Sequence, residues 1–140
     1  MASRAPHYCG IDFGTSNSTV ALATAREHFL ATLEQAERSI PSAIFFDFTT
    51  GRVSFGRAAI ADYLSGENGR FMRALKSVIG RPLFHEKTRI QKRDVTLADI
   101  LSLYLRHLKT TTERQIGHEM KEVVLGRPVQ FIEDSKDLDT

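Results

Sequence analysis

The fold of this chain is decided by the stretch Gly10-Ile11-Asp12-Phe13-Gly14-Thr15-Ser16-Asn17-Ser18-Thr19-Val20. Gly14 has no Cβ, so the backbone there can turn tightly and lie close to a ligand. Thr15, Ser16 and Ser18 can offer hydroxyls and N–H groups to phosphate oxygens. Asp12 is placed to hold a magnesium ion through the waters bound to the metal, because proteins usually bind magnesium through one or two carboxylates together with substrate phosphates. The stretch predicts a phosphate site, although small polar residues between apolar runs also predict an ordinary β-hairpin turn.

Short strands are expected around this turn. Tyr8 to Phe13 and Ser18 to Thr24 flank it, and Phe29 to Leu33 can add a third strand as a meander. Near the other end, Val123 to Gly126 forms a short apolar strand. Strands, then a hairpin and helices, then a returning strand predict an α/β arrangement in which this last strand rejoins the first sheet.

The middle of the chain contains a hairpin and a short helix. After a break at Ser39 to Ser42, the segments Ala43 to Phe48 and Arg52 to Phe55 flank a turn and predict a β-hairpin. Gly56 then opens a helix that covers Arg57 to Leu64. The turn residues that follow it predict its end.

The clearest helical pattern begins at Thr96. Its hydroxyl, with Asp99 three residues later, is typical of a helix N-terminus. Apolar residues then recur at helical spacing, at Leu97, Ile100, Leu101, Tyr104, Leu105 and Leu108. We expect this helix to face the core, to run to Gln115 or Ile116, and to end at Gly117, which accepts positive φ.

The segment from Gly10 to Ser18 resembles the first phosphate motif of the actin-like ATPase superfamily, and most closely the form found in the 70-kDa heat-shock (DnaK-like) chaperones. The resemblance implies an α/β fold: an actin-like ATPase (ribonuclease H-like) lobe, with a mixed sheet and helices and a small α+β subdomain. It implies ATP or ADP with Mg²⁺ as cofactors, with Asp12 holding the metal through water. It also implies that the β- and γ-phosphates are bound by Gly14, Thr15, Ser16 and Asn17.

A second segment resembles the chaperone pattern that carries the catalytic lysine, and it reads Phe71-Met72-Arg73-Ala74-Leu75-Lys76-Ser77-Val78-Ile79-Gly80-Arg81. Aligning its last three residues with the family pattern places Lys76 on that lysine. A lysine there supplies a compact point charge to the transferred phosphoryl group. Without the resemblance, the sequence would predict only that Lys76 is an ordinary surface lysine on a helix. Ser77 stands where the family pattern has arginine.

A third segment, Val123 to Phe131, resembles the family strand that ends in a switch proline. Pro128 aligns with that proline, and the resemblance therefore implies that Pro128 acts as an interdomain switch. By itself, Pro128 also predicts a strand end, because it lacks the N–H that a ladder needs. The form Leu125-Gly126-Arg127-Pro128-Val129 is closest to a divergent YegD-like branch of the family.

The three segments occur in the family's order, which identifies the chain as an N-terminal fragment of the nucleotide-binding domain. We expect residues 1–140 to form the N-terminal lobe, or first half, of a chaperone-type ATPase domain. A sheet subdomain with the phosphate hairpin would take approximately 1–38 and 119–131, and an inserted subdomain approximately 39–118. The family's second phosphate motif, Asp-x-Gly-Gly-Gly-Thr, does not occur in the sequence.

The resemblance therefore implies an ATP-binding lobe of a heat-shock-type chaperone, with magnesium-dependent ATP hydrolysis only when the second lobe is present. ATP hydrolase activity would belong to the full-length protein, as would client polypeptides or co-chaperones. Two alternatives stay open from the sequence. One is a sugar or acetate kinase of the same superfamily, and the other is a non-hydrolysing, degenerate lobe that serves protein–protein contacts.

Composition limits the other classes of function. The 140 residues carry 19 basic and 17 acidic side chains, interspersed along the chain, so nothing favours binding to nucleic acid or to a membrane surface. The single cysteine, Cys9, is expected to be a small buried residue. No apolar run approaches the roughly 20 residues of a membrane span. We expect a cytoplasmic protein.

Overall fold

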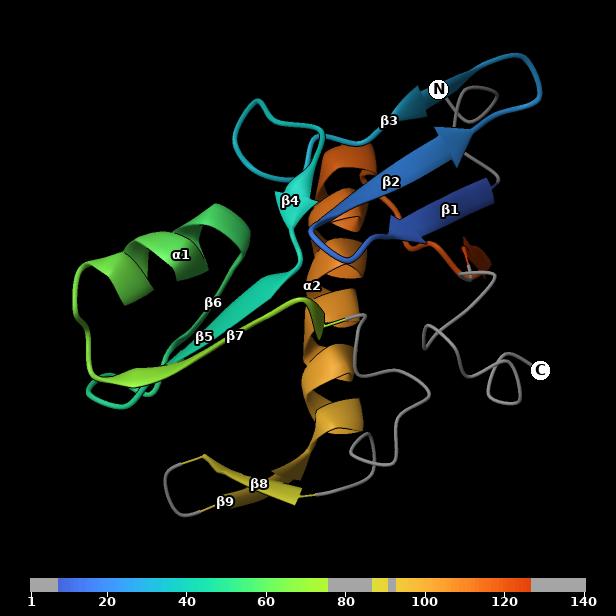
Figure 1. The fold of residues 1–140 in the computed structure, drawn as a ribbon. Coiled ribbons are helices and arrows are strands. Elements are labelled where there is room, and N and C mark those ends of the chain that lie inside the picture. The colour runs from blue at the N-terminus through green and yellow to red at the C-terminus, as the bar shows by residue number, and fades with distance from the viewer. Residues whose placement is uncertain (1–7, 76–86, 91–92, 127–140) are drawn as a thin grey trace, which may run out of the picture.

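The structure of this chain, a computed structural model, describes residues 8–75, 87–90 and 93–126, and a mixed sheet beside a long helix dominates it (Figure 1). The strands of this sheet are β1 (Tyr8–Phe13), β2 (Asn17–Ala23), β3 (His28–Leu30), β4 (Ile40–Pro41) and β10 (Val123–Leu125). Their order is β10-β1-β2-β3, with β4 also paired to β2. β10 is parallel to β1, and the other pairs are antiparallel. The predicted return of the last strand to the first sheet is confirmed.

Residues along β1 alternate between two faces, as a strand half-covered by a core requires. Cys9, Ile11 and Phe13 are buried, whereas Tyr8 and Asp12 are exposed. The predicted burial of Cys9 is therefore confirmed. The pattern also places Asp12 on the open face of the sheet.

A second sheet has the order β6-β5-β7, with the strands β5 (Ala43–Asp47), β6 (Val53–Phe55) and β7 (Gly69–Arg73). The helix α1 (Gly56–Leu64) follows β6 directly. It packs on this sheet through Ala59, which joins Ala43 and Phe45 in a small apolar cluster. The predicted hairpin and short helix are confirmed.

The long helix α2 (Leu97–Ile116) begins and ends as the sequence predicts. Thr96 and Asp99 form a capping box, in which each side chain accepts the other residue's backbone N–H at 3.0 Å. Gly117 closes the helix in the left-handed conformation, with φ of 81°, which glycine adopts at little cost. Ile100, Leu101, Tyr104 and Leu108 are buried, so the predicted core face is confirmed.

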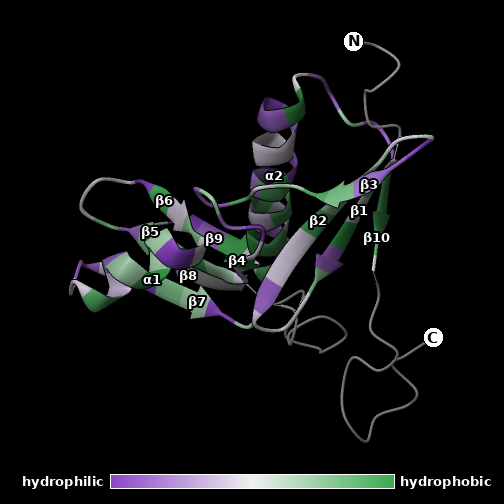
Figure 2. Ribbon diagram, turned by 90° about the horizontal axis from the view of Figure 1, so that it is seen from above, coloured by the Kyte–Doolittle hydropathy of each residue, from purple (hydrophilic) through white to green (hydrophobic). Residues whose placement is uncertain are grey.

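Helix α2 lies between the two sheets in both views of the fold (Figures 1 and 2). The ring of Tyr104 lies 5.6 Å from that of Phe13 on β1 and 6.4 Å from that of Phe55 on β6, measured between centroids. One main core therefore joins α2 to residues of both sheets. The helix fixes the first sheet relative to the second.

Some strand predictions were wrong or incomplete. The strand expected over Phe29 to Leu33 ends at Leu30. Beyond it, the N–H of Thr32 bonds to the Gln115 side chain and that of Leu33 bonds to the Glu37 carbonyl, so the chain leaves the sheet. The expected break before Ala43 contains β4. The sequence also did not predict β7 or the hairpin of β8 (Lys87–Ile90) and β9 (Arg93–Thr96).

Near the end of α2, Glu113 holds the segment that leads back to β10. Its carboxylate accepts the Met120 backbone N–H at 2.8 Å and lies 3.0 Å from Lys109 Nζ. The Met120 N–H, and after it the Lys109 ammonium, lowers the pKa of Glu113.

A lowered pKa in the folded state means that the charged carboxylate stabilises the fold above the ordinary glutamate pKa of about 4.3. This contribution is lost as the pH falls through the lowered value. Glu113→Gln is therefore expected to reduce the free energy of unfolding by about 1 kcal/mol at neutral pH and by much less in acid. Urea unfolding at neutral pH and near the lowered pKa measures the difference. Glu119→Gln, an exposed neighbour, is the control, and an equal loss at both pH values for Glu113→Gln would contradict the assignment.

Candidate functional site

The predicted phosphate turn, Gly14 to Asn17, joins β1 to β2. It is closed by a hydrogen bond in which the Gly14 N–H donates to the Asn17 carbonyl oxygen at 2.9 Å. A Cβ on Gly14 would lie well within 3.0 Å of that same oxygen, an approach that Cβ atoms essentially never make. The turn therefore requires glycine at this position. Thr15 and Ser16 are exposed at its tip.

Asp12 lies immediately before this turn, on the open face of the sheet. It pairs across the ladder with Thr19, on the strand that leaves the turn. The alternation along β1 points its side chain away from α2, because its neighbours Ile11 and Phe13 are both buried in the core. The structure thus brings together a solvent-accessible carboxylate and an exposed turn of small polar residues.

A further residue beside Asp12 was not predicted as part of the site. The N–H of Gly126, just after β10, donates to the Ile11 carbonyl oxygen at 2.8 Å. A Cβ at Gly126 would lie 4.0 Å from Asp12 Oδ1. The absence of a side chain at Gly126 leaves room beside the carboxylate. The sequence places Gly126 just after the predicted last strand, but it does not show that this residue lies next to Asp12.

Two predicted functional residues, Lys76 and Pro128, lie outside the described residues. The residue before Lys76 is described: Leu75 is 3% exposed and belongs to the same core as Ile11 and Phe13.

The side chains at the turn fit a magnesium nucleotide. Within the described ranges, no three His, Cys, Asp or Glu side chains come together to hold a metal ion by themselves. The turn instead combines one carboxylate with hydroxyl and amide groups around a Gly14 position that leaves no room for a side chain. Such a set suits Mg²⁺, whose remaining ligands are waters and substrate phosphates.

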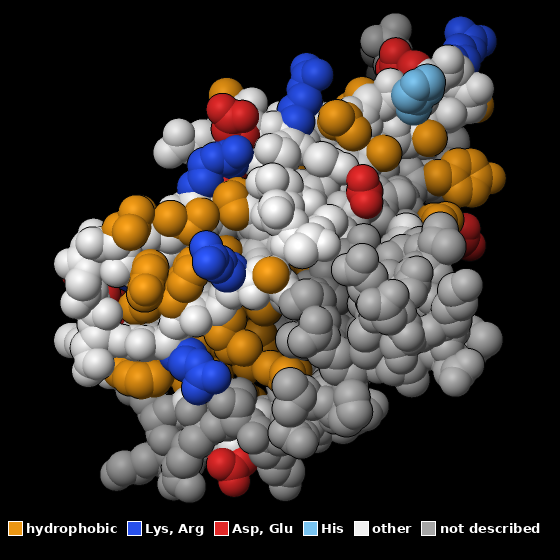
Figure 3. Space-filling view, in the orientation of Figure 1, with side chains coloured by type: hydrophobic (Ala, Val, Ile, Leu, Met, Phe, Trp, Pro, Cys, Tyr) orange, Lys and Arg blue, Asp and Glu red, His pale blue; other side chains and the backbone are white. Residues whose placement is uncertain are grey.

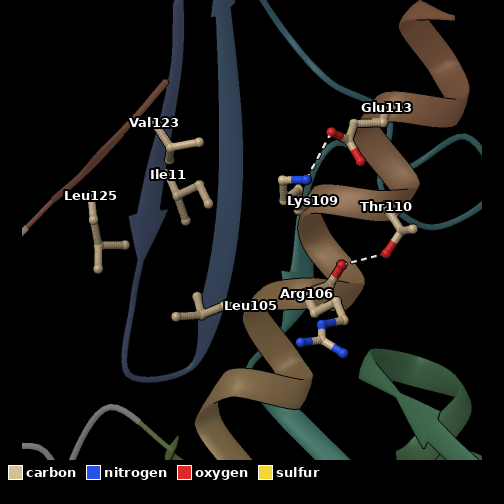
Figure 4. Close-up of a pocket in the computed structure, with 8 residues that line it drawn as sticks. All are labelled: Ile11, Leu105, Arg106, Lys109, Thr110, Glu113, Val123 and Leu125. Atoms are coloured by element: carbon tan, nitrogen blue, oxygen red, sulfur yellow. Dashed lines mark hydrogen bonds and ion pairs between the residues drawn. The ribbon is translucent and has the colours of Figure 1, made fainter. Parts of the chain in front are cut away.

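A cavity of about 660 Å³ lies on the opposite face of the first sheet (Figure 4). Side chains from β1 and β10 line one side and those from α2 line the other: Ile11, Val123 and Leu125, with Leu105, Arg106, Lys109, Thr110 and Glu113. Ile11 lines this cavity, whereas its neighbour Asp12 faces away from the core. The cavity is therefore distinct from the phosphate turn.

Two other chemically reactive side chains lie away from the turn: Cys9 is buried in the core, and His107 on α2 is half-buried. Burial, and then the Glu113 charge, raises the pKa of the Cys9 thiol, which disfavours the nucleophilic thiolate. Burial lowers the pKa of His107, whose ring stacks on Phe55 with centroids 4.1 Å apart. Both groups pack between elements and neither lies at the turn.

Among the described residues on the side seen in Figure 3, charged side chains do not gather in one patch. The Lys and Arg side chains drawn there stand apart from one another, between apolar and uncharged surface. Among the described helices, none has the length and apolar character needed to cross a membrane.

Comparisons with known proteins show which family this chain belongs to. The family model described as "Hsp70 protein" matches residues 8–97, which include Asp12, the turn and the strands from β1 to β9, and which end at the first residue of α2, before β10. The chaperone protein DnaK of Thermosipho africanus (strain TCF52B) is 29% identical over 133 residues, covering 94% of this chain and 21% of that protein. The chaperone protein DnaK of Ureaplasma parvum serovar 3 is 27% identical over 122 residues, covering 87% of this chain and 19% of that protein.

The chain thus spans about a fifth of the length of the curated relatives that it matches. The family model, by contrast, covers well over half of the chain. This chain therefore belongs to the Hsp70 family and has, as the sequence predicts, its actin-like ATPase fold.

Proposed function

We propose that this chain forms the ATP-binding lobe of an Hsp70-type chaperone ATPase, with the phosphate turn as its nucleotide contact. The observation that carries the proposal is the placement of Asp12 and the exposed turn at the same end of one sheet. An apolar strand that ends in a carboxylate and a glycine-closed turn is suited to a metal-bound polyphosphate.

In this proposal, one residue of the turn shapes the backbone and the others bind phosphate. Gly14 allows the close turn, but its own N–H is already donated to the Asn17 carbonyl. The N–H groups of Thr15, Ser16 and Asn17, with the Thr15 hydroxyl, then bind the β- and γ-phosphates. Asp12 orients waters of the Mg²⁺ ion. When bound, the metal offsets the charge of the phosphate oxygens.

Lys76 and Pro128 complete the proposal at two positions outside the described residues. Lys76 follows Leu75, which is buried in the same core as Phe13, the last residue of β1 before the turn. There it would place its ammonium charge on the attacked phosphate. Pro128 follows the Gly126 contact with β1 by two residues, and we propose it as an interdomain switch.

The properties of the whole protein are also proposals. We infer that residues 1–140 correspond to the N-terminal lobe of the ATPase domain. The sheet subdomain would take approximately 1–38 and 119–131, and the inserted subdomain approximately 39–118. We also assign the chain to a YegD-like branch of the family. Magnesium-dependent hydrolysis would need a second lobe, because phosphoryl transfer depends on positioning and charge from all sides of the phosphate. Clients, co-chaperones and a cytoplasmic location belong to the same proposal.

Asp12→Asn tests the role of the carboxylate. The variant keeps the size of the side chain but loses the charge that holds metal-bound waters. We expect its affinity for Mg-ATP to fall about tenfold, within the range for hydrogen bonds to charged groups. Titration followed by NMR amide shifts measures this affinity even when binding is weak.

Chelation of Mg²⁺ gives a second condition. In EDTA, wild type and Asp12→Asn should bind ATP more nearly alike, because the carboxylate acts through the metal. Asp94→Asn, at an exposed position on β9, is the matched control and should behave as wild type. Equal affinities of Asp12→Asn and wild type for Mg-ATP would contradict the proposed role of Asp12.

A further inference from the structure

A network of buried hydroxyls lies directly behind the phosphate turn. Its members are Ser18 on β2, Ser42 between β4 and β5, and Tyr104 on α2, with exposed fractions of 0%, 1% and 0%. They come from three elements that are far apart in the sequence. Since buried polar groups are costly without partners, such a cluster is retained only when its members satisfy one another.

The hydrogen bonds between the two serines and the turn have a fixed direction. The Ser42 hydroxyl donates to the Gly14 carbonyl oxygen at 2.8 Å. A serine hydroxyl has one hydrogen, so in the 2.9 Å contact between the two serine hydroxyls Ser18 must be the donor. Ser18 in turn can accept from the Tyr104 hydroxyl at 3.1 Å, which also lies 3.0 Å from the Pro41 carbonyl oxygen. The hydroxyl contacts therefore link α2 to the turn through Ser18 and Ser42, and the single Tyr104 hydrogen is shared between Ser18 and the Pro41 carbonyl oxygen.

Ser42 holds the turn at a second point. Its backbone N–H donates to the Ser16 carbonyl oxygen at 2.9 Å. The carbonyls of Gly14 and Ser16 are thus both directed toward Ser42. The C=O and N–H of a trans peptide point in opposite directions, and no cis peptide occurs in the described residues. The N–H groups of Thr15 and Asn17, which share those two peptides, therefore point away from Ser42.

We propose that Tyr104, Ser18 and Ser42 are positioning residues that fix the turn with the Thr15 and Asn17 N–H groups directed at the nucleotide phosphates. This inference rests on the proposed function for its ligand, but the hydrogen bonds that fix the turn are formed within the chain itself. Preorganised donors bind better than mobile ones, because less ordering is needed on binding. Burial raises the pKa of Tyr104, which keeps its hydroxyl protonated and able to donate.

Tyr104→Phe tests the network with the smallest change, since it removes the hydroxyl and keeps the ring against Phe13 and Phe55. Amide hydrogen exchange without nucleotide is the first measurement. The Gly14 and Ser42 amides report the turn, because they donate to Asn17 and Ser16. We expect both to exchange about tenfold faster than in wild type, the effect of losing one ordinary hydrogen bond. The Gly117 amide, which donates to Glu113 at the end of α2, should keep its wild-type rate.

Mg-ATP affinity is the second measurement, and it should fall by a similar factor in Tyr104→Phe. Ser42→Ala should show both effects more strongly, because it removes the donor to Gly14 itself. Tyr63→Phe is the matched control: it deletes a hydroxyl from a tyrosine that is 53% exposed on α1 and should change neither measurement. If Ser42→Ala does not fold, Tyr104→Phe alone decides.

Three results would overturn the inference. In Tyr104→Phe, the Gly14 and Ser42 amides could keep their wild-type exchange rates. Alternatively, their exchange could become faster only by the same factor as that of the Gly117 amide, a result that would indicate general destabilisation. Faster exchange at the turn with unchanged Mg-ATP affinity would also contradict a positioning role. Failure of the proposed function is a separate result, namely a wild-type turn that does not respond to Mg-ATP, because exchange is measured without nucleotide.

Discussion

Gly14→Ala is expected to abolish the response of the phosphate turn to Mg-ATP. The added methyl would overlap the Asn17 carbonyl oxygen, which is a backbone atom and cannot rotate aside as a side chain can. It would also open the hydrogen bond from Gly14 to Asn17 that closes the turn. Once the turn opens, Thr15 and Asn17 no longer present their N–H groups together. NMR titration with Mg-ATP measures the loss, and circular dichroism checks that the chain stays folded.

Gly10→Ala is the matched control for this prediction. Gly10 lies on β1, the strand that leads into the turn, and a Cβ there would have Val124 O as its nearest neighbour at 3.9 Å, an ordinary contact. This variant should bind Mg-ATP as wild type does. A folded Gly14→Ala protein with wild-type affinity would show that the turn does not contact the nucleotide.

Leu108→Ala is expected to cause a large loss of stability, about 3 kcal/mol in the free energy of unfolding, because it removes a fully buried side chain and leaves a cavity. Leu108 is 0% exposed in the main core, where α2 meets the first sheet. Urea unfolding followed by circular dichroism measures the change.

Leu103→Ala, on the same helix but 39% exposed, makes the same chemical change outside the core. Its expected loss is below about 1 kcal/mol, because partly exposed side chains contribute less apolar burial. Equal losses for the two variants would contradict the assignment of α2 to the core between the sheets.

The sequence predicted the elements whose signals are local. The ends of α2 depend on Thr96, Asp99 and Gly117, each of which acts within a few residues of its own position. The apolar spacing along α2 likewise determines its buried face without reference to the other elements. β1 and the hairpin of β5 and β6 combine apolar runs with nearby turn residues, so their limits were also predictable.

The missed strands depend on partners that are distant in the sequence. β7 pairs with β5, more than twenty residues earlier, and its own sequence, Gly-Arg-Phe-Met-Arg, has only two apolar side chains. β4 has two residues and forms by pairing with β2. β8 and β9 are short and carry several charged residues, without the Asn-Gly or Asp-Gly turn that marks a tight hairpin.

The candidate site divides in the same way. Asp12 and the turn are adjacent in the sequence, so a motif could identify them together. Gly126 reaches Asp12 only because β10 pairs with β1 in parallel, and Ser42 reaches the turn only through the pairing of β4 with β2. No spacing rule links these positions. Membership of the Hsp70 family favours the chaperone hypothesis over the sugar or acetate kinase alternative.

The most direct test of the account is an NMR titration of this chain with three ligands: Mg-ATP, magnesium tripolyphosphate and adenosine. Because the turn contacts phosphate groups, the account predicts that Mg-ATP and magnesium tripolyphosphate both shift the amides from Gly14 to Asn17, and that adenosine leaves them unchanged. Wild-type turn amides that do not respond to either phosphate ligand, or shifts confined to another part of the chain, would contradict the assignment of this turn as the nucleotide contact.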